Sequence, residues 1–137
     1  MAIRGLTNIR ASASLTTSYV AASVVNCREA DSIILLIGYT MGADETANAV
    51  IFKVEWSMDG TTYFQDANFS ANSDAITDGA VTIDKNEFTY TADSAAATYD
   101  YIAVPLKALG QMVKVSFKET GVVTNAGTCV AYIGLVE

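Results

Sequence analysis

The sequence predicts an all-β protein, an antiparallel β-sandwich of about eight strands with jelly-roll or Greek-key-like connections. Apolar and polar side chains alternate over residues 50–57 and again over residues 111–119, the period of a half-buried strand. Asp59-Gly60 follows the first of these stretches, and an Asp-Gly pair is a strong signal for a hairpin turn. Short apolar stretches separated by turn residues recur along the chain, which is typical of a sandwich or barrel.

The first third of the chain predicts an edge segment and two strands. Residues 1–13 are small and polar with scattered apolar side chains, and they are interpreted as an extended arm or a first edge strand. Residues 14–22 are rich in Thr, Tyr and Val and predict a strand. After a turn at 26–31, residues 32–41 contain five consecutive apolar residues, which suits a strand buried on both faces. The expected domain organisation is an arm, 1–13, followed by a single sandwich domain, 14–137.

A hairpin is expected after the polar loop 42–48, with strands at 49–58 and 61–65. Its turn at Asp59-Gly60 is predicted to be type I′, which needs a positive φ at both central residues. Pro105 is expected to stop a strand because it lacks an N–H. Single helical turns are the most that residues 92–97 and 106–110 allow. The remaining strands are expected at 80–83, 87–91, 98–104, 111–119 and 128–136.

Composition and charge restrict the classes of partner. Apolar residues make up 51% and charged residues 17%, so either much Ala and Gly lies outside or a partner covers apolar surface. The net charge of −7 disfavours nucleic acids and anionic membranes as partners. Three arginines are the only charges in residues 1–28, whereas the remainder holds five lysines and fifteen acids. This contrast suggests a positive arm that docks on an acidic surface, or a frayed terminus kept soluble by its arginines.

The sequence offers little for catalysis, so a non-enzymatic protein without a cofactor is expected. It has no histidine, which removes the commonest general base and metal ligand. Cys27 and Cys129 are interpreted as small buried hydrophobes, with a disulfide as the lesser alternative. No phosphate-binding loop, secretory signal or membrane-spanning stretch is evident, so synthesis in a cytoplasm is expected.

Residue types suggest two other kinds of site, a calcium site and a sugar-stacking platform. Asp74, Asp78 and Asp84, or the pair Asp44-Glu45, have the oxygens that calcium prefers, but acids in such loops are also ordinary turn formers, and no metal is expected. Trp56 alternates with core residues, so it is predicted to fill the core rather than to form a sugar-stacking platform with Tyr63, Phe64 and Phe69. Tyr99 and Tyr101 are predicted to be exposed and to join a subunit interface.

Residues 54–63 contain a strand that ends in Trp-Ser-Met-Asp-Gly and continues to Tyr63. This stretch, together with the strand-turn-strand pattern before it, resembles the β-sandwich virion proteins of tailed bacteriophages over residues 14–65. Small, acidic chains rich in Ala, Thr and Gly are similar to capsid decoration (cement) proteins. The resemblance implies binding to the major capsid protein lattice on the virion exterior, with self-association as a homo-oligomer, a trimer being favoured. It implies no catalytic residues.

In this interpretation the arm provides the contacts with a neighbouring chain. Ile3, Leu6 and Ile9 are the expected apolar anchors, and Arg4 and Arg10 are the expected ion-pair partners. The alternatives are a tail or fibre module that binds carbohydrate, and a tail-tube or head-completion subunit whose loop 66–80 orders on assembly. A secreted calcium-dependent adhesin is disfavoured by the lack of a signal sequence.

Overall fold

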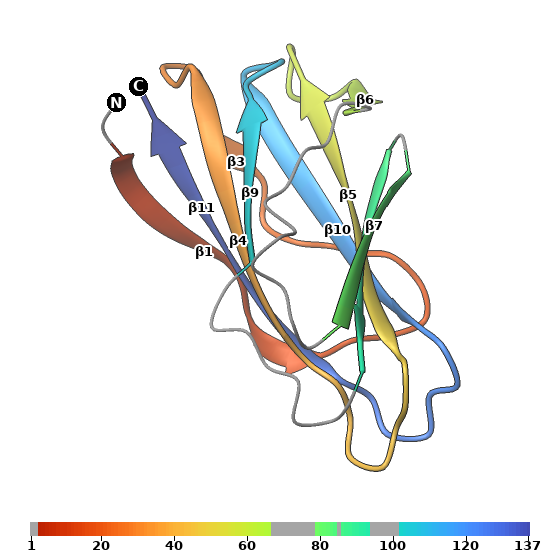
Figure 1. Cartoon of the computed structure of the whole chain (residues 1–137). Helices are drawn as coiled ribbons and strands as arrows, with labels where there is room; N and C mark the ends of the chain where they lie inside the picture. Colours follow the sequence, from red (N-terminus) through yellow and green to blue (C-terminus); the bar gives the residue numbers. More distant parts are fainter. Residues whose placement is uncertain (1–2, 67–78, 85, 94–101) are drawn as a thin grey trace.

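Two antiparallel sheets pack face to face in the computed structural model, which describes residues 3–66, 79–84, 86–93 and 102–137 (Figure 1). Most of the described residues lie in strands and no helix occurs among them, so the predicted antiparallel β-sandwich is confirmed. Strand bounds are Ile3–Ser14 (β1), Val20–Ala21 (β2), Val25–Asn26 (β3), Ser32–Thr40 (β4), Ala49–Ser57 (β5), Tyr63–Gln65 (β6), Gly79–Asp84 (β7), Glu87–Ala92 (β8), Ile102–Lys107 (β9), Met112–Thr120 (β10) and Thr128–Val136 (β11).

The order of the strands places β1 at one edge of the molecule. The first sheet has the order β1-β11-β4-β9, and the second has the order β2-β10-β5-β8-β7, with β3 added to β10 and β6 added to β5. Sequence-distant strands therefore lie side by side, as β1 and β11 do at the left of Figure 1. All paired strands in the described part of the chain are antiparallel.

Large aromatic side chains from both sheets fill the core. Trp56 is fully buried, and its indole N–H donates to Asp66 Oδ2 at 2.9 Å, so the prediction that Trp56 lies in the core is confirmed. The Phe52 and Phe88 rings stack with centroids 4.7 Å apart. Such burial removes large apolar area from water and supplies the main stabilisation of the fold.

Both cysteines are buried and neither forms a disulfide, which confirms their interpretation as small buried hydrophobes. Burial raises the pKa of Cys129 to about 12, and burial also raises the pKa of Cys27. Because the thiolate is the reactive form, neither sulfur is suited to nucleophilic chemistry near neutral pH.

The β5–β6 hairpin forms, but its turn is not the predicted type I′. Ser57 pairs with Tyr63, so the connection holds five residues, and only Gly60 has a positive φ, 84°. Side chains close the turn instead: Asp59 Oδ1 accepts the Thr61 and Thr62 N–H groups at 2.9 and 2.7 Å. Asp59 therefore acts as an anion that receives backbone donors.

Replacing Asp59 with asparagine is expected to lower Tm modestly at pH 7. Hydrogen bonds from the backbone of Thr62 and Thr61 hold the pKa of the Asp59 carboxyl well below its ordinary value of 3.8. The stabilisation is therefore complete above pH 3.8 and is lost as pH falls through the lower pKa of the folded state. Thermal unfolding of both proteins between pH 7 and pH 2 should show the Tm gap closing in acid. A gap that widens in acid would contradict this account.

Three other expectations about local structure are wrong. The segment 14–22 is mostly irregular, because β1 extends to Ser14 and only Val20–Ala21 pairs, as β2, with β10. Pro105 does not stop a strand but lies inside β9, which is tolerated because β9 is an edge strand. The expected helical turn at 106–110 is replaced in part by the end of β9 at Lys107.

The expectation that residues 32–41 are buried on both faces is also wrong. Along β4, Ile33, Leu35 and Ile37 are buried, whereas Ile34 and Leu36 are only half-buried. The sheet that contains β4 has its partner sheet on one side only, so alternate residues of the apolar run must point outward.

Candidate functional site

The outward side of the four-stranded sheet is apolar. Its residues follow from the register: Leu6, Gly134, Ile34 and Pro105 form one row across all four strands, and Asn8, Tyr132, Leu36 and Ala103 form the next. A third row pairs Val130 with Gly38. We call this surface the outer face; it comprises Leu6, Asn8, Ser32, Ile34, Leu36, Gly38, Ala103, Pro105, Lys107, Val130, Tyr132 and Gly134.

The outer face carries a single charge, that of Lys107. This residue lies at the rim of the face, in a further row where it pairs with Ser32. Leu6 is 56% exposed, and Ile34, Leu36 and Val130 are half-buried. Antiparallel sheets that face solvent normally alternate apolar residues inward with polar residues outward. The outer face departs from that pattern, which is typical of a surface that a partner covers.

The opposite surface of the sandwich follows the usual pattern. Lys53 and Glu55 on β5 and Lys114 and Lys118 on β10 point outward between buried neighbours. The Tyr19 ring lies 4.7 Å from Lys53 Nζ and 4.5 Å from Lys118 Nζ, measured to the ring centroid. These cation–π contacts cover part of that sheet with groups of the same chain.

Tyr19 is held at its other end as well. Its hydroxyl donates to the Glu87 carboxylate on β8, and partial burial, this hydrogen bond and the negative charge of Glu87 raise the pKa of Tyr19. The outward side of the seven-stranded sheet is therefore polar and internally paired, which makes the two outward surfaces chemically unlike.

The amino-terminal strand has a free edge over residues 3–8. In the part of the chain that the structure describes, its ladder partners there come only from β11. Further along, the Ile9 carbonyl accepts the Ser23 N–H at 3.1 Å, so at Ile9 the free side of β1 is bonded to its own molecule. A free strand edge can pair with a strand of another chain. We call residues 3–8 the β1 edge.

The residues expected to dock on a neighbour have different positions. Leu6 is exposed on the β1 edge, but Ile9 is 4% exposed and packs in the core of its own chain, so it is not a docking anchor. Arg10 donates to the Cys129 and Ser14 carbonyls at 3.2 and 2.9 Å rather than standing free as an ion-pair partner. Ile3 and Arg4 lie in β1.

The tyrosines expected at the same interface, Tyr99 and Tyr101, lie outside the described residues. The sequence reasoning missed the outer face because the apolar run was placed wholly in the core. A signal was present: only one face of a strand in a two-layer sandwich meets the core, so a continuous apolar run leaves apolar residues on the other face.

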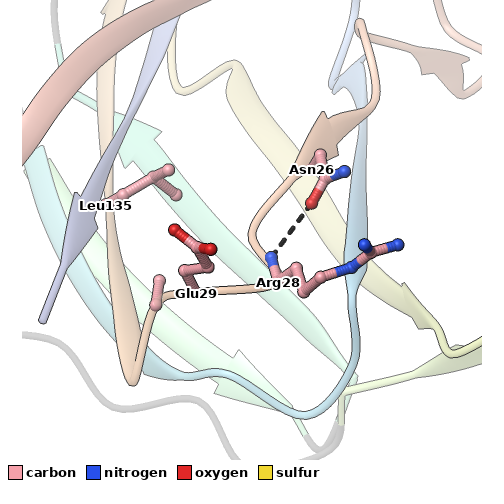
Figure 2. Close-up of a pocket in the computed structure, with 5 residues that line it drawn as sticks. Asn26, Arg28, Glu29 and Leu135 are labelled. Atoms are coloured by element: carbon pink, nitrogen blue, oxygen red, sulfur yellow. Dashed lines mark hydrogen bonds between the residues drawn. The ribbon is translucent and has the colours of Figure 1, made fainter.

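A cavity of about 290 Å³ opens between the β3–β4 turn and the end of β11 (Figure 2). Asn26, Arg28, Glu29, Ala30 and Leu135 line it. The Arg28 guanidinium points away from Leu135 and donates through Nε to Gln111 Oε1 at 3.3 Å. The backbone N–H of Arg28 donates to Asn26 Oδ1 at 3.0 Å. These polar groups do not converge on one point, so the cavity lacks the arrangement of a catalytic centre.

The loop acids serve the fold where they are described. Glu45 accepts the N–H groups of Thr124 and Asn125, the second at 2.6 Å, and so joins two loops. Asp74 and Asp78 lie outside the described residues. Within the described ranges, no group of three or more Cys, Asp or Glu side chains is placed to hold a metal ion.

Comparison with protein-family models, with curated proteins and with solved structures gave no match to this chain. A search of the described residues for helices found none that is long and apolar enough to cross a membrane.

Proposed function

We propose that this protein is a non-enzymatic structural protein of a tailed-bacteriophage virion that binds the outside of the capsid and stabilises the head. The β1 edge carries the proposal, because its free main-chain groups and exposed Leu6 are suited to pairing with a strand of a capsid subunit. The resemblance of residues 14–65 to virion β-sandwich proteins names the partner.

The physical basis is mass action on an assembled lattice. A ligand that binds only the assembled shell stabilises the shell by its binding free energy. Many copies on a repeating surface need only modest individual affinity, because linked contacts gain avidity. A protein in this role is made in the host cytoplasm and ends on the virion exterior.

The test is co-sedimentation with undecorated, expanded heads. We expect the wild-type protein to pellet with the heads, and Leu6→Glu to lower its affinity at least about tenfold, because a charge at a pairing edge opposes strand addition. Val122→Glu is the matched control, since Val122 is 81% exposed in the β10–β11 loop, at the end of β11 opposite to the part that pairs with the β1 edge. Its affinity should equal that of the wild type.

Wild-type protein that stays in the supernatant would refute the proposal, and a positive glycan array would then favour a tail or fibre module. Equal pelleting of Leu6→Glu and the wild type would remove the β1 edge as the contact. Deletion of residues 1–10 is a poorer test than substitution, because it also removes Ile9 from the core.

A carbohydrate-binding function has weaker support. Phe64 is 42% exposed, but its cross-strand neighbour Trp56 is fully buried, so the strongest stacking residue is not accessible to a sugar. The loop 66–80 invoked for a tail-tube subunit lies largely outside the described residues.

A further inference from the structure

We propose that the outer face binds the outer face of a second copy of this chain, giving a two-fold dimer in which two four-stranded sheets pack against each other. This assembly goes beyond capsid binding and does not depend on it. Because a self-complementary face binds one identical face, a dimer is expected in place of the trimer that the family resemblance implies.

The relief of the outer face suits another sheet. Large side chains lie beside positions with a small side chain or none: Ile34 lies between Gly134 and Pro105, and Val130 lies opposite Gly38. Sheets that pack face to face approach to about 10 Å by interdigitating such side chains. Ile34 and Leu36 would then complete the burial that their own monomer gives only in part.

The size of the outer face fits a weak, reversible dimer. Its rows cover about seven residues, from Ser32 to Gly38 on β4, and strands lie about 4.8 Å apart with a rise of about 3.3 Å per residue, so the face spans roughly 19 by 23 Å. Each copy would thus contribute on the order of 450 Å², and the pair about 900 Å², which is in the range of weak, transient interfaces.

Charge selects a second copy over other partners. The chain has a net charge of −7, so two copies repel each other wherever carboxylates meet. The outer-face rows hold no carboxylate, and their single charge, Lys107, lies at the rim of edge strand β9. A charged partner would find no complement there, whereas an identical uncharged surface meets no repulsion.

The dimer also fits the β1 edge. The free side of β1 points along the plane of the sheet, away from β11, so packing on the outer face leaves the main-chain groups of the β1 edge open but covers the Leu6 side chain, which belongs to both surfaces. A dimer would carry two such edges, which is the bivalence that strengthens binding to a repeating lattice.

Sedimentation velocity of the purified protein, without heads, tests the dimer. We expect a wild-type mass of twice 14.5 kDa at about 100 μM, because an interface of this size is weak and reversible. Leu36→Glu should raise the dimer Kd by about 100-fold or more, because like charges would meet across an apolar contact. Thr89→Glu is the matched control, a half-buried outward position on β8 of the other sheet, and should leave the dimer intact.

Val130→Glu is a second outer-face variant, which tests the dimer if Leu36→Glu does not fold. Circular dichroism should show native strand content in each variant. A wild-type protein that remains monomeric at about 1 mM would overturn the inference, because even a weak interface should form a dimer at that concentration. A folded Leu36→Glu protein that remains dimeric would also overturn it. So would a wild-type trimer whose mass neither substitution changes. A dimer that fails to pellet with heads would refute capsid binding alone, and a monomer that pellets would refute the dimer alone.

Discussion

Replacing Glu119 with alanine is expected to destabilise the fold by about 3–5 kcal/mol, because it breaks a buried charged hydrogen-bond group. Glu119 is 1% exposed at the end of β10. Its carboxylate accepts the Tyr39 hydroxyl at 2.5 Å and the Gly127 N–H at 2.9 and 3.1 Å. Alanine would leave both donors without a partner in the core.

Urea unfolding followed by circular dichroism measures this effect. Asp93→Asn, the loss of a charge at an exposed position, is the control and should change stability by no more than about 0.5 kcal/mol. Tyr39→Phe should cost less than Glu119→Ala, since the Gly127 N–H still reaches the carboxylate. If Glu119→Ala were as mild as the control, Glu119 would not be the group that holds the β10–β11 loop.

Trp56→Ala is expected to cost about 3–5 kcal/mol as well, because a fully buried indole would leave a large cavity in the centre of the sandwich. The loss of the indole N–H also removes a donor to Asp66. Partial collapse of the cavity sets where in the range the value falls. The chain has one tryptophan, so the variant is followed by circular dichroism rather than by fluorescence.

Phe64→Ala is the matched control for this substitution. Phe64 pairs with Trp56 across the β5–β6 hairpin, but it is 42% exposed and should cost only about 1 kcal/mol. In the wild type, Trp56 fluorescence should resist quenching by acrylamide. Strong quenching, or a fluorescence change on adding sugars, would contradict the buried position and revive the carbohydrate-binding alternative.

Much of the strand pattern was accessible from the sequence. The alternation over residues 50–57 and 111–119 identified β5 and β10 and the side chains that each turns inward, because a strand has a period of two. The turn type at Asp59 was not accessible: the local signal is for a two-residue turn, but pairing of Ser57 with Tyr63 imposes a longer one.

The candidate surfaces were only partly predictable. Leu6 and Ile9 look alike in the sequence, yet bulges in β1 direct Ile9 into the core and leave Leu6 in solvent. Arg10 likewise turns to its own carbonyl groups. No local pattern distinguishes these outcomes, because they depend on the register of β1 against a strand more than a hundred residues away.

The sequence by itself determined the β class of this protein, its buried tryptophan and its lack of histidine chemistry, since each follows from local periodicity or from composition. Only the tertiary structure decided which side of the apolar strand β4 the other described strands leave uncovered, and that β1 ends a sheet. The physical reason is that a period of two defines two faces of a strand, whereas the pairing of distant strands and the stacking of sheets decide which face meets the core.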